Sequence, residues 1–154
     1  MIKVAIYYVA KHKDLSDSIC EEYIHLIASF GVKMEFINLF GKNIKEKQKF
    51  NEKEARRSYT QEFTKVFRNN LYTIALTPQA DMFDSLQFAE VLSKRADIGF
   101  FIGGAYGLEE EFIQKCDKKI SLSSLTMSHK TAKIVLSEQI YRCFCLLNNH
   151  PYHK

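Results

Sequence analysis

Apolar runs that alternate with helical patterns constrain the fold of this chain more than any other feature of its sequence. The first run, Ile2 to Val9, is apolar at most positions, which is typical of a strand covered on both faces of a sheet. Comparable runs cover Val32 to Leu39, Leu71 to Thr77 and Asp97 to Ile102, and a shorter one includes Lys119 and Ile120. This alternation predicts an α/β fold with a parallel sheet and helices on both faces.

The segments between these runs carry helix signals. Asp14 or Ser16 can cap the first helix, and Gly31 stands where its C-terminal cap belongs. Further helices are expected from the following basic segment to about Asn69, over Ser85 to Arg95, from near Glu109, and over Lys130 to Asn148. Residues at helical spacing that are expected to face the sheet include Ile19, Tyr23, Leu26, Ile27, Phe30 and Leu86. The 154 residues and 46% hydrophobic composition predict one domain, residues 1–154.

The sequence lacks the signals of a membrane protein and of a metalloprotein. No segment reaches the roughly 18 apolar residues of a membrane span, and Met1 to Val4 already resembles a strand rather than a signal peptide. We therefore expect a cytoplasmic protein without a membrane partner. The cysteines form no C-x-x-C pair, which favours free thiols. A zinc site would need a closer cluster with histidines, so we expect no metal.

Two loops that follow strands form the candidate ligand site. The loop 103–107 contains three glycines within five positions, directly after an apolar run. Glycine permits positive φ and lets a ligand approach the main chain, and ligands gather at the carboxyl ends of open α/β sheets. The second loop, Ser121 to Ser128, is rich in hydroxyls and follows the short strand. Taken singly, the first loop is also typical of a tight turn, and the second of a helix entry capped by Thr126 or Ser128.

A basic segment runs from Lys42 to Arg57. Its seven basic and three acidic side chains carry a net charge of +4, which equals the net charge of the whole chain. Lys and Arg gain affinity for a polyanion by displacing its counterions, so the segment can be a loop that contacts RNA phosphates and leads into a helix. A solvated connection kept soluble by lysine is an equally good interpretation of the charge alone.

Several stretches together resemble one family. They are Ile102-Gly-Gly-Ala-Tyr-Gly-Leu108, Ser121-Leu-Ser-Ser-Leu-Thr126 with His129, Ser137-Glu-Gln-Ile-Tyr-Arg142, and Asn149-His-Pro-Tyr-His153. With them the chain resembles, over about its full length, the RlmH family of small bacterial SPOUT methyltransferases, which methylate N3 of a pseudouridine in 23S rRNA. The resemblance implies a homodimer that acts on the ribosome. It also implies a C-terminal trefoil knot, a feature otherwise essentially absent from proteins.

The resemblance implies S-adenosylmethionine as the methyl donor. Backbone groups of the two loops are expected to hold its adenine and ribose. The implied residues are Leu76, Gly103, Gly104, Ser123, Ser124, Leu125, Thr126, Met127 and Ser128. The chain departs from the family pattern at Thr77, which replaces an acid, and at Ala105 and Ser128, which replace prolines. We expect these changes to affect rate and affinity rather than the identity of the reaction.

The reaction requires help in removing a proton. N3 of pseudouridine carries an imide proton and is a poor nucleophile until that proton leaves, so a base or a cationic setting that stabilises the anion is needed. The resemblance implies His153 or Glu138 for proton removal, Arg142 for charge or phosphate contact, and Tyr152 for stacking on the base or hydrogen bonding to it. The residues expected to bind RNA are Lys42, Lys45, Arg56, Arg57, His129 and Lys133, the last where arginine is common.

Two other functions fit parts of the sequence. A SPOUT enzyme with a different rRNA or tRNA target would share both loops but not the tail from Asn149 to His153. A non-enzymatic α/β module could bind ribosomes through the basic segment alone. A terminal tail is ordinarily frayed, so the tail is the place where these interpretations diverge most.

Overall fold

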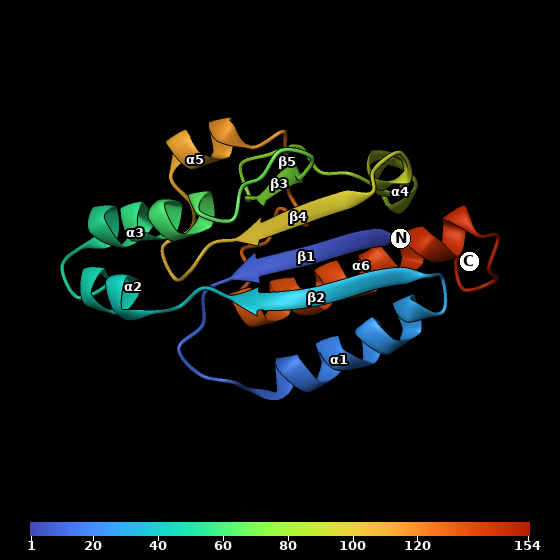
Figure 1. The fold of residues 1–154 in the computed structure, drawn as a ribbon, viewed down its shortest axis with the longest axis horizontal. Coiled ribbons are helices and arrows are strands. Elements are labelled where there is room, and N and C mark those ends of the chain that lie inside the picture. Colours follow the sequence, from blue (N-terminus) through green and yellow to red (C-terminus); the bar gives the residue numbers. More distant parts are fainter.

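The computed structural model describes residues 1–154, which form a five-stranded sheet with helices on both faces (Figure 1). The elements are β1 (Ile2–Tyr8), α1 (Leu15–Ala28), β2 (Val32–Asn38), α2 (Lys42–Lys47), α3 (Glu52–Thr64), β3 (Tyr72–Leu76), α4 (Ser85–Ser93), β4 (Asp97–Ile102), α5 (Glu110–Lys115), β5 (Lys118–Ile120) and α6 (His129–Leu147). The strand order is β2-β1-β4-β3-β5, and every pairing is parallel. The predicted α/β class is confirmed. How the C-terminal segment threads is not fixed by strand order, and the trefoil knot stays a prediction.

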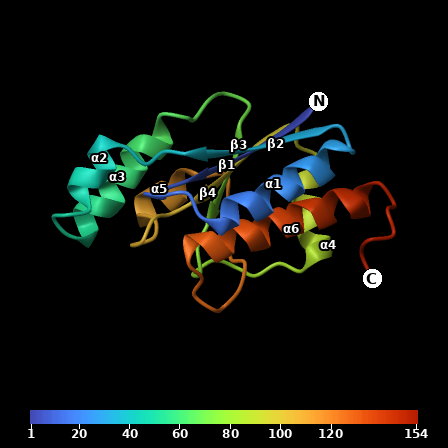
Figure 2. The same cartoon turned by 90° about the horizontal axis from the view of Figure 1, so that it is seen from below.

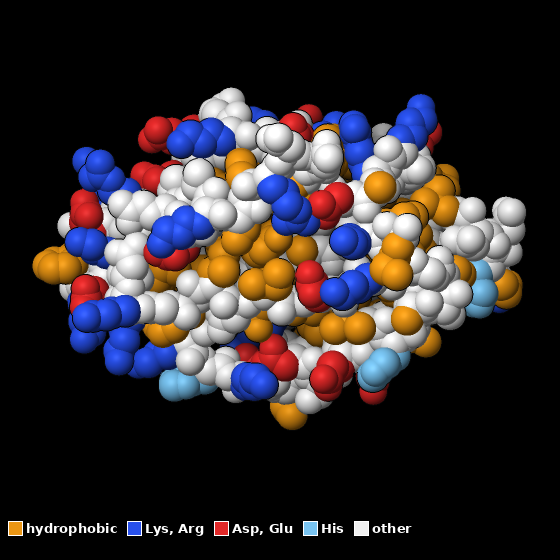
Figure 3. All heavy atoms as spheres, in the orientation of Figure 1, with side chains coloured by type: hydrophobic (Ala, Val, Ile, Leu, Met, Phe, Trp, Pro, Cys, Tyr) orange, Lys and Arg blue, Asp and Glu red, His pale blue; other side chains and the backbone are white.

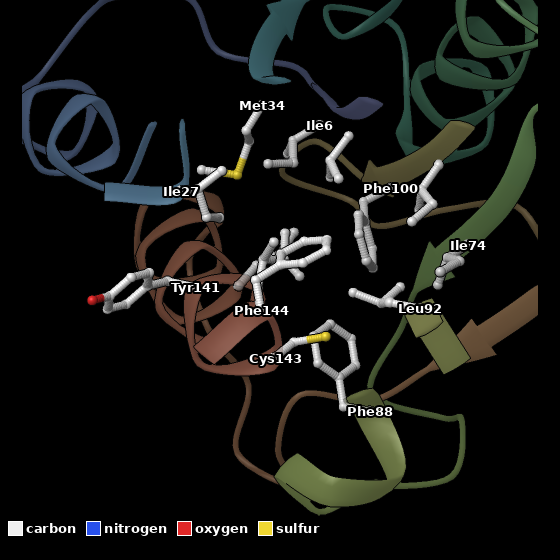
Figure 4. Packing of buried hydrophobic residues seen from close by; sticks show 14 of the residues in the cluster. Ile6, Ile27, Met34, Ile74, Phe88, Leu92, Phe100, Tyr141, Cys143 and Phe144 are labelled. Carbon is white, nitrogen blue, oxygen red and sulfur yellow. The ribbon is translucent and has the colours of Figure 1, made fainter. Parts of the chain in front are cut away.

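Strand β1 is apolar on both faces because helices cover both sides of the sheet. Val4 and Ile6 belong to a core cluster with residues of α1, α4 and α6, whereas Ala5 and Tyr7 belong to a second cluster with residues of α2, α3 and α5. Figure 2 shows α6 lying between α1 and α4 in the first of these layers. Figure 4 shows how the first cluster fills the space between this layer and the sheet. Only the strand ends are therefore left uncovered.

An aromatic cluster fixes the second layer next to the end of β4. The ring of Phe101 lies 5.4 Å from the rings of Phe63 and Phe67 and 5.3 Å from that of Phe112, measured between centroids. Aromatic pairs at such separations contribute more than their buried area alone. The cluster holds the end of α3 and α5 against the strand that leads into the glycine loop.

The structure corrects the prediction for the basic segment. It is not a single loop leading into a helix, because Lys42–Lys47 forms the short helix α2. Ile44 of this helix is fully buried in the second cluster, which supplies the reason for its folding. Helix α3 ends at Thr64 rather than near Asn69. The chain turns at residues 65–66 and again at 69–70, where two consecutive asparagines favour a turn.

Three apolar side chains that were predicted to face the sheet face solvent instead. Ile19 is 38% exposed, Leu26 is 45% exposed and Leu86 is 59% exposed. The layer made of α1, α4 and α6 therefore has apolar side chains on its outer surface as well as its inner one. None of the helices combines the length and the apolar character needed to cross a membrane.

Candidate functional site

The loops after β3, β4 and β5 enclose a hollow at the carboxyl ends of these strands. Because all strands are parallel, their carboxyl ends lie on the same side of the molecule, toward α2 and α3 in Figure 1. The hollow has a volume of about 190 Å³. It is lined by Leu76 to Pro78, by residues within 102–107, by residues within 121–127 and by the start of α6. The two predicted loops thus meet at one place.

Most residues that the resemblance implied for the donor line this hollow. They are Leu76, Gly103, Gly104, Ser123, Leu125, Thr126 and Met127. Ser124 and Ser128 do not line it: Ser124 is exposed, and Ser128 caps α6, where its hydroxyl oxygen accepts a hydrogen bond from the backbone N–H of Thr131 at 3.2 Å. The geometry is compatible with the predicted donor site, whose role in binding stays a prediction.

Gly104 packs against Tyr59, a core residue of α3. A Cβ atom on Gly104 would lie 2.5 Å from Cζ and from the hydroxyl oxygen of Tyr59, closer than side-chain atoms approach. Tyr59 is fully buried, and burial raises the pKa of its hydroxyl to about 12. The hydroxyl donates a hydrogen bond to Oε1 of Gln48 at 3.0 Å. Glycine at 104 is therefore required for the contact between the loop and α3, and no signal in the sequence pairs these residues.

The other two glycines determine the shape of the loop itself. A Cβ atom on Gly103 would lie 2.6 Å from the backbone carbonyl carbon of Gly107. Gly107 has φ +77°, a conformation that side chains disfavour. The backbone N–H of Gly107 donates to the carbonyl oxygen of Gly104 at 3.1 Å, which closes the turn.

Two residues predicted to bind RNA lie at the start of α6, inside or beside the hollow. His129 lines the hollow, and burial, followed by the charge of Lys133, lowers the pKa of its imidazole, which is therefore neutral at pH 7. Lys133 is 1% exposed, with Nζ 3.0 Å from Oδ1 of Asp17 and 4.2 Å from the ring centroid of Tyr8. A buried charge must be paired inside the protein, and Asp17 takes that role, so the RNA contact of Lys133 stays a prediction that its burial argues against.

The remaining predicted RNA contacts divide into free lysines and paired arginines. Lys42 and Lys45 are exposed and make no ion pair. Arg56 lies 3.6 Å from a carboxylate oxygen of Glu52, and Arg57 lies 4.0 Å from one of Glu54. Their role in RNA binding stays a prediction, and the lysines have the more available charge.

The C-terminal tail folds back onto α6. Asn149 adopts the left-handed conformation with φ +54°, which asparagine tolerates, and thereby ends the helix. The backbone N–H of His150 then donates to the carbonyl oxygen of Cys145 at 2.8 Å. The ring of Tyr152 packs on that of Tyr141 with centroids 4.8 Å apart. The tail is therefore not a frayed end.

The four residues implied for catalysis form one connected cluster. Oε1 of Glu138 accepts hydrogen bonds from Nη2 of Arg142 at 2.6 Å, from Nε of Arg142 at 3.0 Å and from the hydroxyl of Tyr152 at 3.0 Å. Nη1 of Arg142 lies 3.3 Å from Nδ1 of His153. Burial and the hydrogen bond to Glu138 raise the pKa of Tyr152, while the hydrogen bond that Arg142 donates to Glu138 raises the pKa of the arginine. The tyrosine therefore stays protonated and the arginine charged.

This cluster does not reach the hollow within one chain. Glu138 stands nine residues beyond His129 on α6, which is about 14 Å at the rise of an α-helix. The tail lies further away, at the end of the molecule where β1 begins (Figure 1). The hollow thus lies at the N-terminal end of α6, whereas the implied catalytic residues lie between the middle of this helix and the tail beyond its C-terminal end.

The chain is similar to known proteins in both sequence and fold. Residues 2–153 match the family described as "Predicted SPOUT methyltransferase". The chain is 42% identical over 154 residues to Ribosomal RNA large subunit methyltransferase H of Aliarcobacter butzleri and 40% identical over 155 residues to that of Wolinella succinogenes, with 99% of this chain and 100% of each relative covered. A solved ribosomal RNA small subunit methyltransferase E of Neisseria gonorrhoeae, bound to S-adenosyl methionine, has a TM-score of 0.56 at 10% identity. That match covers 90% of this chain and 65% of the other, and it shows a shared fold.

The contact between the glycine loop and α3 predicts the effect of a single methyl group. Gly104→Ala should lower the free energy of unfolding by about 1–3 kcal/mol, because the added atom overlaps the buried ring of Tyr59. Urea unfolding at a fixed protein concentration measures this change. Gly41→Ala is the matched control, since no atom lies within 4 Å of a Cβ there. Equal effects of the two substitutions would contradict the proposed contact.

Proposed function

The chain belongs to the RlmH family of SPOUT methyltransferases, and from this premise we propose that it methylates N3 of a pseudouridine in 23S rRNA on the assembled, cytoplasmic ribosome. The enzyme uses S-adenosylmethionine as the methyl donor. One observation carries the proposal: the two loops on which the resemblance rests line one hollow at the carboxyl edge of the sheet. The substrate belongs to the class of RNA. We propose in addition which nucleoside is methylated, that the methyl group goes to its N3 position, and that the ribosome is the form in which the RNA is recognised.

The residues that line the hollow are suited to hold the adenine and ribose of such a donor. Backbone groups of the loops 103–107 and 121–127 border it, and the hydroxyls of Ser123 and Thr126 stand among them. When bound, the donor supplies an electrophilic methyl group on a sulfonium. The volume of about 190 Å³ lies below the roughly 300–1,000 Å³ typical of ligand pockets. A single chain would therefore enclose only part of the donor, which supports completion of the site by a second subunit.

A homodimer also accounts for the apolar outer surface of the layer made of α1, α4 and α6. Leu15 on α1 is 83% exposed, Leu86 on α4 is 59% exposed, and Leu125 in the loop before α6 is 73% exposed. Apolar side chains gathered on one face mark an interaction surface. A two-fold dimer that pairs these faces would bury them without any other partner.

Two-fold symmetry supports a role for the tail at the hollow of the partner. In an isologous interface each subunit offers the same surface, so helices that cross it can run antiparallel. If α6 meets its copy in this way, the C-terminal half of one helix, which carries Arg142 and leads into the tail, lies beside the His129 end of the other. The distance of about 14 Å that separates the two groups within one chain is then bridged between chains.

The hydrogen bonds of the tail favour a cationic setting over a base. Glu138 already accepts three hydrogen bonds at Oε1, and its Oε2 accepts a fourth from Nε2 of Gln139 at 2.6 Å. Arg142 can only donate, so its contact with Nδ1 of His153 makes that atom the acceptor and leaves the ring proton on Nε2. We infer that His153 and Arg142 stabilise the anion of the acceptor base by donating to it, with Tyr152 beside it.

Substitution of His153 distinguishes its role as a hydrogen-bond donor to the anion from the role of a base that removes the proton. His153→Gln should retain turnover within about tenfold, because an amide can still donate a hydrogen bond, whereas His153→Ala should lose about 10²- to 10³-fold. Single-turnover methylation of ribosomes lacking the modification measures both, with donor affinity by calorimetry as the control. A Gln variant as slow as the Ala variant, together with a rate that rises as the histidine loses its proton, would assign His153 the role of a base instead.

The reaction itself is tested in the cell. Mass spectrometry of 23S rRNA from a strain that lacks this protein should find a methylpseudouridine missing, and an intact copy should restore it. Loss of a different methylated nucleoside would indicate another rRNA or tRNA target. No lost nucleoside, combined with no donor binding, would favour a ribosome-binding module without catalytic activity.

A further inference from the structure

The turn between α2 and α3 carries an exposed aromatic ring, and we call this turn, together with the helix residues that flank it, the tip (residues 47–53). Phe50 is 70% exposed and belongs to neither core cluster. No other ring stacks on it, and the side chain that lies over it is that of Lys47, with Nζ 5.4 Å from the ring centroid. Because Phe50 contributes to no core, its ring is available for a contact outside the chain.

The side chains around Phe50 are positively charged and available. Lys47, Lys49 and Lys53 make no ion pair. Of the three acidic residues of the basic segment, Glu52 and Glu54 are each paired with an arginine of α3, and only Glu46 is unpaired beside the lysines. Figure 3 shows Lys and Arg side chains gathered at the end of the molecule where α2 and α3 lie. The ring therefore stands in a positive field.

The tip is held in one conformation before any partner binds. The backbone N–H of Phe50 donates to the carbonyl oxygen of Lys47 at 3.1 Å, and the side chain of Asn51 caps α3 by accepting from the N–H of Glu54 at 2.8 Å. Gln48 accepts the hydrogen bond from the buried hydroxyl of Tyr59. A preorganised surface binds with less loss of conformational freedom. Tyr59 also packs on Gly104, so one residue supports both the tip and the donor loop.

We propose that the tip is a stacking platform for one unpaired base of the RNA substrate, with Phe50 against the base and the neighbouring lysines against its flanking phosphates. Every base has an apolar face, and proteins that hold single-stranded nucleic acid combine aromatic rings with cationic side chains in this way. The tip lies toward the same end of the sheet as the hollow, where the strands end (Figure 1). The inference rests on the proposed function for its premise that the substrate is RNA.

The test measures binding of the full-length protein to a fluorescein-labelled single-stranded oligoribonucleotide by anisotropy. Phe50→Ala and Phe50→Leu should each weaken binding by about 5- to 100-fold, whereas Phe50→Trp should retain it, because base stacking needs an aromatic face. The same oligonucleotide with 2-aminopurine in place of one base should lose fluorescence on binding to the intact protein and not on binding to Phe50→Leu. Urea unfolding of each variant accompanies these measurements, and a stability equal to that of the intact protein separates an effect on binding from an effect on folding.

The lysines are tested through the salt dependence of the same binding. Replacing Lys47 and Lys53 together by Gln should reduce the slope of log K against log salt by about 0.7 for each phosphate that is no longer neutralised. Lys3→Gln is the matched control, because Lys3 is exposed and unpaired at the start of β1, the opposite end of the sheet. An equal change of slope in the control would overturn the role given to the tip lysines.

Other results would overturn the platform while leaving the proposed function intact. The proposal that Phe50 stacks on a base would be contradicted if Phe50→Ala or Phe50→Leu bound the oligonucleotide as tightly as the intact protein does. Weaker binding to ribosomes without weaker binding to free RNA would assign the tip to a ribosomal protein instead. Donor binding by the intact protein and the nucleoside that this protein methylates in the cell test the proposed function without any substitution of Phe50. If the tip binds RNA by stacking but the protein does not methylate 23S rRNA, the proposed function is contradicted and the stacking platform is not.

Discussion

The burial of β1 and β4 on both faces is the constraint on which the rest of the structure depends. Neighbouring residues of each strand point into different cores, as Phe100 and Phe101 do, and only at the end of β4 does a side chain, that of Ile102, also line the hollow. Because every strand is parallel, the backbone groups that a ligand can reach lie together where the strands end. The glycine loop and the hydroxyl loop occupy those ends. The position of the hollow thus follows from how the sheet is covered.

The last helix separates the two halves of the chemistry. Helix α6 must pack between α1 and α4 to cover the first face, and this packing directs its C-terminal end away from the hollow. The tail then folds back onto the C-terminal half of α6, where Tyr152 and Arg142 both donate to Glu138. A structure of this kind holds two well-ordered parts that cannot meet within one chain. In our account the second subunit is required for the active site, and the exposed apolar residues of the same layer are the surface through which it binds.

Periodicity and turn chemistry were enough to predict the strands and the place of the two loops. The range Asp97–Ile102 was predicted with the bounds that β4 has, and Ser128 was among the two caps considered for α6. Contacts between distant elements could not be predicted in this way. Nothing in the sequence places Lys133 beside Asp17 or Tyr59 beside Gly104, because these pairs depend on how helices pack across the sheet. The outward-facing Leu26 was missed for a related reason: helical spacing identifies an apolar stripe but not which neighbour covers it.

The central claim is that each active site combines the hollow of one subunit with the tail of the other, and mixing two defective subunits tests it most directly. One subunit carries Ala105→Trp, which places a large side chain at the exposed rim of the hollow, and the other lacks residues 152–154. Each variant alone should be inactive, provided that the first is shown not to bind the donor. After random re-association, half of the dimers are mixed, and each has one site with an intact hollow and an intact tail. We expect about a quarter of the intact activity to return on this symmetry argument. No recovery, with mixed dimers present, would contradict the account.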